Sequence, residues 1–306
     1  MKPLISIVIA NYNYGRFLDE AIQSVLSQTC QDFELIVCDA ASSDDSVDII
    51  RRYANGLPPK TRREDFANCA QGKLAWWCSE KDRGQSDAFN KGFAQAKGRF
   101  LTWLNADDVL LPGAIERLKS AVGKHPACEW FVGGCFWLDP EMKIIRCGRG
   151  RPFSEIRYRE GNVSVWGPSS VFTKRLLDAV GGFDLRFKYS MDSDIWMKFA
   201  CKEHARYKVF SDYAWGLRLH PEAKMSGHNF TADGKFDVNA KGKDLAAFER
   251  KMQQLRNEYH WIEESAFPYR KSTRLSRLLS ASWGAAFGGR VDTRRYAGRH
   301  YMEVYK

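Results

Sequence analysis

Two adjacent carboxylates, Asp107 and Asp108, follow a short apolar segment in the first half of the chain. The apolar run at 100–104 predicts a buried strand, and open α/β sheets bind ligands at the carboxyl ends of their strands. Because like charges this close repel, the pair favours a cation or hydrogen-bond donors between the two groups. Hard oxygen ligands suit Mg²⁺ or Mn²⁺, with substrate phosphates completing the coordination. A plain turn leading into a helix at Pro112 fits the same residues equally well.

Two further acidic turns are predicted along the same sheet. Asp39 ends a predicted strand at 33–38, and Asp82 precedes a predicted helix at 84–96. Parallel strands end on one rim, so carboxylates far apart in sequence can converge there. In a nucleotide site Asp39 would accept a hydrogen bond from a base or ribose, and Asp82 with Arg83 would orient the base or phosphate side. As isolated motifs, an Asx turn at Asp39 and helix capping at Asp82 are equally good explanations.

Predicted strands and helices alternate through the first 124 residues. Apolar and β-branched runs predict the strands, and apolar residues at helical spacing predict the helices between them. The strands are expected at 4–10, 33–38, 74–78 and 100–104, and the helices at 17–26, 46–53, 84–96 and 112–122. This order is typical of an α/β fold with a mostly parallel sheet and right-handed crossovers. Beyond it we expect a hairpin, short helices and extended segments, at 129–147, 163–172, 174–180, 195–201, 207–219 and 244–267.

The composition is that of a globular protein with a sizeable core. The chain has 306 residues, of which 44% are hydrophobic, enough for one large α/β domain with an appendage. Its longest apolar runs, such as residues 5–10, are far shorter than a membrane span, and its first residues do not resemble a signal peptide. The eight cysteines contain no CxxC pair, which favours reduced thiols in a cytoplasmic protein over zinc sites or disulfides.

Positive charge is concentrated near the C-terminus. The formal net charge is +10, and residues 270–306 contain nine Lys or Arg against Asp292 and Glu303. This asymmetry indicates an anionic partner or surface. Cations interleaved with Trp283 and Phe287 are typical of segments that contact a membrane surface, and a solvated extension is the alternative. No recognisable module supports nucleic acid as a partner.

Seven motifs occur in an order that resembles the family 2 glycosyltransferases. They lie at residues 6–13, 37–39, 82–92, 104–108, 182–184, 191–196 and 218–221. The resemblance covers residues 3–225 and implies a GT-A fold, a Rossmann-like and mostly parallel sheet with a smaller antiparallel part on the acceptor side. It implies a GT-A domain at 1–240, with a nucleotide-sugar half at 1–110 and an acceptor half at 111–240. A helical, basic C-terminal extension would then occupy 241–306.

The resemblance implies a nucleotide-binding role for residues of the first three motifs. Asp39 resembles the carboxylate that contacts the base, and Ala10 and Tyr12 resemble backbone and ring positions that line the nucleotide. Asp82 and Arg83, from the third motif, are expected beside them. Family members use nucleotide-diphosphate sugars, and we expect a UDP-sugar as the donor.

The same resemblance implies a site for Mn²⁺ or Mg²⁺. Residues 105–107 occupy the place of the family's DxD motif, with Asn105 replacing its first acid. Asp107 is expected near the ribose and the metal, and Asp108 is a second candidate ligand, so the choice between them stays open. His220 matches the C-terminal histidine that completes metal or diphosphate binding, and Lys224 is expected to contact a phosphate.

A general base is expected among the acids that precede the predicted helix at 195–201. An inverting transfer needs a carboxylate that removes the acceptor proton while the acceptor oxygen attacks the anomeric carbon. We assign this role to Asp192. Asp194 is the competitor, although helix capping suits it better. Trp166 lies where the family positions the acceptor, so stacking on a sugar is an alternative to a core role.

These features together predict a non-processive, inverting glycosyltransferase that acts on a glycan, lipid-linked or other hydroxyl acceptor. The resemblance implies surface polysaccharide or glycoconjugate synthesis, in the cytoplasm or peripherally at the inner face of the membrane. The Gln-x-x-Arg-Trp motif of processive relatives is absent. A sugar nucleotidyltransferase is one alternative, for which residues 11–15 make a poor phosphate loop. A non-catalytic nucleotide- or glycan-binding protein is the other.

Overall fold

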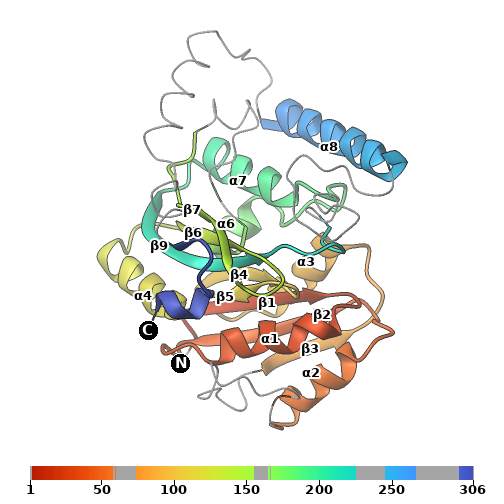
Figure 1. Ribbon diagram of the computed structural model, residues 1–306. Helices are drawn as coiled ribbons and strands as arrows, with labels where there is room; N and C mark the ends of the chain where they lie inside the picture. The colour runs from red at the N-terminus through yellow and green to blue at the C-terminus, as the bar shows by residue number, and fades with distance from the viewer. Residues whose placement is uncertain are drawn as a thin grey trace.

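The computed structural model describes residues 2–57, 59, 74–154, 165, 167–224, 245–266 and 296–305. Within these ranges one mixed sheet runs through the molecule, with helices on both of its faces (Figure 1). The strand order is β3-β2-β1-β4-β8-β6-β9-β5, and β7 pairs with β6 outside this path. The strands are β1 (Ile5–Asn11), β2 (Phe33–Asp39), β3 (Leu74–Ser79), β4 (Phe100–Asn105), β5 (Val109–Leu110), β6 (Trp130–Leu138), β7 (Ile144–Gly148), β8 (Ser170–Thr173) and β9 (Tyr207–Arg218).

Helices follow the first strands in the alternation that the sequence predicts. They are α1 (Gly15–Leu26), α2 (Ser46–Ala54), α3 (Gln85–Gln95), α4 (Ala114–Lys124), α6 (Lys174–Ala179), α7 (Met191–Cys201) and α8 (Leu245–Ala266). Two 3₁₀ turns, η2 (Gly167–Ser169) and η4 (Tyr301–Val304), complete the described elements. The expected helix at 244–267 is thus confirmed as α8.

The sheet changes character between its two halves. Strands β3, β2, β1 and β4 are all parallel neighbours. Strand β8 is antiparallel to both β4 and β6, and β5 is antiparallel to β9, whereas β6 and β9 are parallel. The expected hairpin is the antiparallel pair β6–β7. The predicted α/β fold, parallel in its first half and partly antiparallel in its second, is confirmed.

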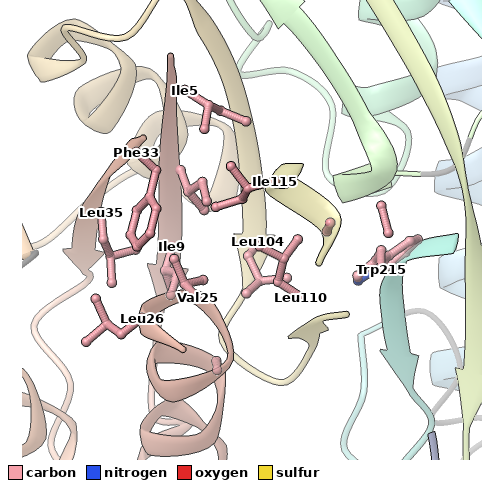
Figure 2. Close-up of a cluster of buried hydrophobic side chains, with 14 of the residues drawn as sticks. Ile5, Ile9, Val25, Leu26, Phe33, Leu35, Leu104, Leu110, Ile115 and Trp215 are labelled. Atoms are coloured by element: carbon pink, nitrogen blue, oxygen red, sulfur yellow. The ribbon is translucent and has the colours of Figure 1, made fainter. Parts of the chain in front are cut away.

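Two hydrophobic layers cover the two faces of the sheet. In β1, Ile5, Ile7 and Ile9 pack with α1, α2 and α4, and Figure 2 shows part of this layer. Val8 points to the opposite face, where α3, α6 and α7 pack. This alternation is the period of two that a strand buried on both faces imposes. Both layers therefore fix the rim at which the parallel strands end.

Two helices begin at residues other than those predicted. Helix α4 starts at Ala114 rather than Pro112, because Gly113 takes a left-handed φ of 69° and ends the preceding turn. Helix α7 starts at Met191 rather than near Ile195. The residues before Ile195 are short and acidic, which suits the first turn of a helix as well as a turn preceding one.

The described C-terminal residues pack against the rest of the chain. Helix α8 contacts α7, and Ile262 of α8 is 1% exposed. Residues 296–305 return to β7, where His300 bridges Lys143 and Tyr301 is 1% exposed. A solvated extension is therefore wrong for these ten residues, while 267–295, with most of the basic charge, lie outside the described residues. Among the described helices none is both long and apolar enough to span a bilayer.

Candidate active site

Strand register brings the predicted polar residues to one rim. Asn11 is paired with Asp39, Ala10 with Asn105, and Asp39 with Ser79. The carboxyl ends of β3, β2, β1 and β4 are therefore level with one another. The turn after β4 carries Asp107 and Asp108 onto the same rim.

Asp39 is held in a fixed orientation by neutral donors. Its carboxylate accepts hydrogen bonds from Asn11 Nδ2 at 2.7 Å, from Ser79 Oγ at 2.6 Å, and from the Ser42 amide and hydroxyl at 3.0 and 2.5 Å. The side chain is 2% exposed. The bond from the Ser42 amide is the local contact expected of an Asx turn at Asp39. Asn11 and Ser79, by contrast, belong to β1 and β3. Asn11 Oδ1 is buried and has no partner among the described atoms.

The loop after β1 is tied to the loop after β2. Ser42 Oγ accepts the Asn13 amide at 2.8 Å, and Asn13 Oδ1 accepts the Ser43 amide at 2.8 Å. Asn13 has a φ of 55°, a left-handed conformation that asparagine tolerates. Tyr12 is 61% exposed on this loop, and Ala10 is half-buried at the strand end. Both residues thus lie beside Asp39, where the sequence predicts the nucleotide.

Asp82 and Arg83 lie at the start of α3. Asp82 Oδ1 accepts the Gly84 amide at 2.8 Å, so the capping role exists. Burial raises the pKa of Asp82, and the charges of Asp87 and Asp39 add to this effect. The amide of Glu80, two residues before Asp82, donates to the Asp39 carbonyl at 3.0 Å, so Asp82 follows directly from the rim that holds Asp39. Arg83 is exposed and forms an ion pair with Asp87 at 3.0 Å.

Asp107 faces His220 across the rim. His220 Nε2 lies 3.1 Å from Asp107 Oδ2, and its Nδ1 lies 3.2 Å from Glu222 Oε2. The histidine is 2% exposed and packs edge-on against Tyr14. Hydrogen bonds from Arg16 and His220 lower the pKa of Glu222 to about 2. The imidazole is therefore held between two carboxylates.

Asp108 points away from Asp107 into the protein. It is 1% exposed and accepts the Arg218 amide at 3.0 Å and Asn105 Nδ2 at 2.7 Å. Burial, followed by the charge of Asp107, raises its pKa well above the usual value. Its bonds join the end of β4 to the end of β9. The geometry thus separates the two acids, with Asp107 beside His220 and Asp108 in the interior.

The donor set at Asp107 and His220 suits a divalent cation. An imidazole with a carboxylate oxygen near each nitrogen needs a proton or a cation at both places. When Nδ1 carries the proton and donates it to Glu222, the Nε2 lone pair faces the Asp107 carboxylate, and these two acceptors repel each other. A cation between them relieves that repulsion. Among the described residues no group of three or more His, Cys, Asp or Glu could hold a metal. Further ligands would have to come from substrate phosphates or water.

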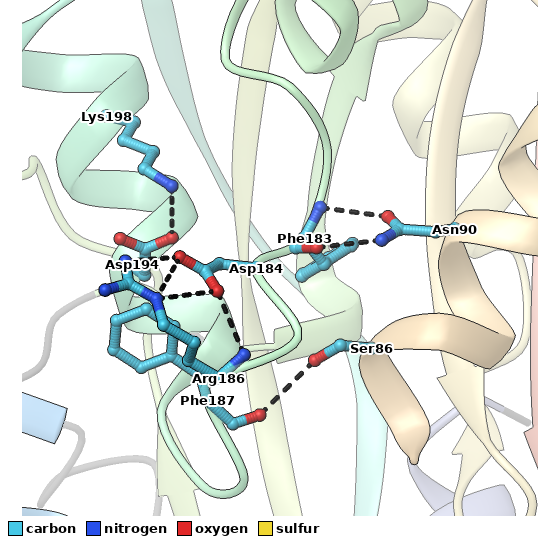
Figure 3. Close-up of polar contacts among 8 residues, drawn as sticks. All are labelled: Ser86, Asn90, Phe183, Asp184, Arg186, Phe187, Asp194 and Lys198. Carbon is cyan, nitrogen blue, oxygen red and sulfur yellow. Dashed lines mark hydrogen bonds and ion pairs between the residues drawn. The ribbon is translucent and has the colours of Figure 1, made fainter. Parts of the chain in front are cut away.

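Asp192 and Asp194 occupy the first turn of α7 but have different surroundings. Asp194 is 1% exposed and bonds Lys198 Nζ at 2.6 Å (Figure 3). The expected capping role of Asp194 is wrong, since Ser190 is the N-cap residue. Asp192 is half-buried and accepts the Ser193 amide at 2.7 Å. Burial raises the pKa of Asp192 to about 6, which the charge of Lys224 partly offsets.

The loop before α7 is tied to α3. Asn90 donates to the Phe183 carbonyl at 2.8 Å and accepts the Phe183 amide at 2.9 Å, and the Ser86 hydroxyl donates to the Phe187 carbonyl at 3.4 Å (Figure 3). Gly182 has a φ of 77°, and a Cβ there would lie 2.9 Å from Asn90 Oδ1. The third and fifth motifs therefore join the two halves of the site.

Several site residues were not assigned from sequence. Gln85 accepts a bond from Lys224 Nζ at 3.0 Å and donates to Asn105 Oδ1 at 2.8 Å. Asn11 lies inside the motif at 6–13 and Glu222 directly follows the motif at 218–221, so their positions in the sequence indicate that they belong to the site. Glu258 on α8 accepts amides of the loop before α7, and nothing in the sequence distinguishes it from other helix acids. Trp166 lies outside the described residues.

The described residues thus form a mixed sheet with a polar rim, on which Asp107 faces His220. Residues 6–141 match the family model Glycosyl transferase family 2. It is 40% identical over 114 residues to an uncharacterized glycosyltransferase of Nostoc sp., covering 37% of this chain and 31% of the relative. The chain spans 29% to 59% of the length of the first four curated relatives it matches.

Solved structures share the fold. Staphylococcus aureus TarS 1–349 in complex with UDP has a TM-score of 0.52 and 20% identity, covering 71% of this chain and 61% of that chain. A mannosyltransferase of Pyrobaculum calidifontis in complex with GDP-Man and Mn²⁺ has a TM-score of 0.52 and 17% identity. It covers 99% of this chain and 86% of that chain. Both likenesses establish the GT-A architecture.

Proposed function

We propose that this protein is an inverting glycosyltransferase that moves a sugar from a nucleotide-diphosphate sugar to an acceptor hydroxyl. One observation carries the proposal: Asp107 and His220 lie 3.1 Å apart on the rim that also holds Asp39 and Asp82. A cation position and a base-recognition position on one rim match the two ends of a nucleoside diphosphate. The match of residues 6–141 to Glycosyl transferase family 2 supports the same reaction.

The donor would lie across the ends of β2, β1 and β4. The fixed carboxylate of Asp39 and the unpartnered Asn11 Oδ1 are acceptors that suit N–H donors of a base. Ala10 and Tyr12 would line the nucleotide, with Asp82 and Arg83 toward its outer side. We expect a UDP-sugar, and the UDP complex of TarS supports this choice at the level of the fold.

Asp107 and His220 would hold Mn²⁺ or Mg²⁺, and Lys224 would contact a phosphate. When bound, the cation would neutralise the charge that develops on the leaving diphosphate. Glu222 keeps the imidazole oriented through Nδ1, a positioning contact of the kind found around metal-ligating histidines. Asp108 would position the strand ends rather than bind the ion. The complex of the Pyrobaculum mannosyltransferase with Mn²⁺ supports a divalent cation.

Asp192 would act as the general base. A carboxylate whose pKa is about 6 is ionised at neutral pH and accepts a proton more readily than an ordinary aspartate. Asp194 is a poor competitor because Lys198 already neutralises it. Removal of the acceptor proton by Asp192 would let the oxygen attack the anomeric carbon while the diphosphate leaves from the opposite face.

The acceptor is proposed to be a glycan or a lipid-linked glycan, in surface polysaccharide or glycoconjugate synthesis. The seven described cysteines are free thiols, which supports a cytoplasmic location. Peripheral membrane contact through the basic C-terminal segment, and the division at residue 240, remain predictions. The absence of nucleic acid among the partners is also a prediction.

A panel of nucleotide-sugars with Mn²⁺ or Mg²⁺ tests the proposal, with the released nucleoside diphosphate as the readout. We expect release that requires both a divalent cation and an acceptor hydroxyl. Release of pyrophosphate from a nucleoside triphosphate and a sugar phosphate would instead indicate a nucleotidyltransferase. Tight donor binding without any turnover across the panel would indicate a binding protein.

A further inference from the structure

Three lysines surround one tyrosine ring beside the proposed general base. The Nζ atoms of Lys188, Lys224 and Lys251 lie 5.7, 5.6 and 5.6 Å from the centroid of the Tyr189 ring. Lys251 Nζ also donates to the Lys224 carbonyl at 3.0 Å. Three ammonium groups from three separate segments therefore surround one aromatic ring, at distances typical of cation–π contact.

Helix α8 is anchored so that Lys251 reaches this cluster. Glu258 is fully buried and accepts the amides of Lys188, Tyr189 and Ser190 at 2.8, 3.0 and 2.7 Å. Gln254 donates to Glu258 Oε1 at 3.0 Å. Residues 251, 254 and 258 lie on one face of a helix, because they are three, four and seven positions apart. The loop and the helix are thus locked together around Tyr189.

Two carboxylates of the described part of the chain, Glu258 and Asp192, act on Lys224, and Glu258 is directed at the three backbone amides. Desolvation lowers the pKa of Lys224 to about 8, although part of the residue remains exposed. Desolvation, followed by the charge of Lys224, lowers the pKa of Lys251 to about 8. Clustered, partly desolvated ammonium groups are unfavourable alone and become favourable when an anion binds among them.

We propose that Lys188, Lys224 and Lys251, arranged around Tyr189, form a binding site for a phosphate group. The phosphate would belong either to an anionic acceptor, such as a phosphate-linked glycan, or to the diphosphate of the donor. This choice of sources rests on the proposed function, whereas the site itself does not. The new element is α8, which lies outside the residues that match the family model. This helix supplies Lys251, and its Glu258 positions Lys188.

Calorimetric titration of inorganic phosphate into the full chain at constant ionic strength, without metal, tests the site. Lys188→Gln and Lys251→Gln should each weaken phosphate binding about tenfold, since each removes one charge-assisted hydrogen bond. Lys124→Gln is the matched control, because Lys124 is an exposed lysine at the end of α4, outside the cluster. All three changes are at exposed or half-buried positions, and thermal melting checks that each variant folds.

A second arm identifies the source of the phosphate. If the donor diphosphate occupies the site, Lys251→Gln weakens UDP binding with Mn²⁺ but leaves uridine binding unchanged. If the acceptor phosphate occupies it, UDP affinity stays at the control level while inorganic phosphate binding falls. Phosphate binding that is absent, or equal in the cluster variants and Lys124→Gln, would overturn the proposal. Phosphate binding that depends on Lys251 in a protein without turnover would overturn the proposed function and leave the site intact.

Discussion

Asp107 Oδ2 lies 3.1 Å from His220 Nε2, although 113 positions separate the two residues. The neighbouring acid explains how they meet. Asp108 accepts the Arg218 amide at 3.0 Å and so holds the end of β9, two residues before His220, against the turn after β4. The two adjacent acids therefore have different roles: Asp108 positions β9, and Asp107 faces His220.

Removing Asp108 should destabilise the fold more than removing Asp107. Asp108→Ala leaves the Arg218 amide without its buried acceptor, which should lower the free energy of unfolding by about 2 kcal/mol. Asp107 is less buried, so Asp107→Ala should change it by less than about 1 kcal/mol. Urea denaturation of both variants provides the comparison. The reverse order would mean that Asp108 is not the structural acid.

The transfer rate should fall as the pH falls through about 6. Burial raises the pKa of Asp192 to about 6, and the base must be ionised, so protonation below that pH removes activity about tenfold per unit. Initial rates from pH 4.5 to 8 at saturating donor give the profile. A rate that stays flat down to pH 5 would remove Asp192 from the role of base.

The same pKa predicts the stability of Asp192→Asn. A folded-state pKa raised above the unfolded value means that the ionised form is disfavoured by folding. Asp192→Asn should therefore raise the free energy of unfolding at pH 8 by about 1–2 kcal/mol, less than the full shift because the side chain keeps some solvent contact. This gain should shrink as the pH falls through 6 toward 4. Denaturation at pH 8 and at pH 4 measures it, and an equal effect at both would contradict the assignment.

Gly92 should be intolerant of even one methyl group. A Cβ at Gly92 would lie 2.3 Å from Val8 Cγ1, so Gly92→Ala forces α3 away from β1 and should cost about 1–3 kcal/mol. Gly123 in α4 is the matched control, since a Cβ there meets nothing within 4 Å. Gly123→Ala should be neutral or stabilising by up to about 1 kcal/mol. Equal thermal melting temperatures for the two variants would show that α3 packs differently.

The architecture could be predicted because it depends on local patterns. Alternating strand and helix signals gave the parallel sheet, and register then required Asp39 and Asn105 to share a rim. The predicted starts of α4 at Pro112 and of α7 near Ile195 were less accurate, because short polar residues and glycine fit either a turn or the first turn of a helix. Propensity alone does not decide between those two states.

The roles of particular side chains depended on contacts that sequence does not contain. Asp107 and Asp108 are chemically identical, and only their orientation toward His220 or Arg218 distinguishes them. Glu258 resembles any solvent-facing acid on a helix until its contact with the loop before α7 is known. Long-range pairing decided each of these cases.

Mn²⁺ binding to the full chain in the presence of UDP tests the central assignment most directly. Electron paramagnetic resonance of free Mn²⁺ gives the affinity, and folded Asp107→Asn and His220→Ala should each lose at least about tenfold. Asp108→Asn, if folded by circular dichroism, should stay within about twofold of the wild type. Loss of Mn²⁺ affinity in Asp108→Asn with retention in Asp107→Asn would contradict the account.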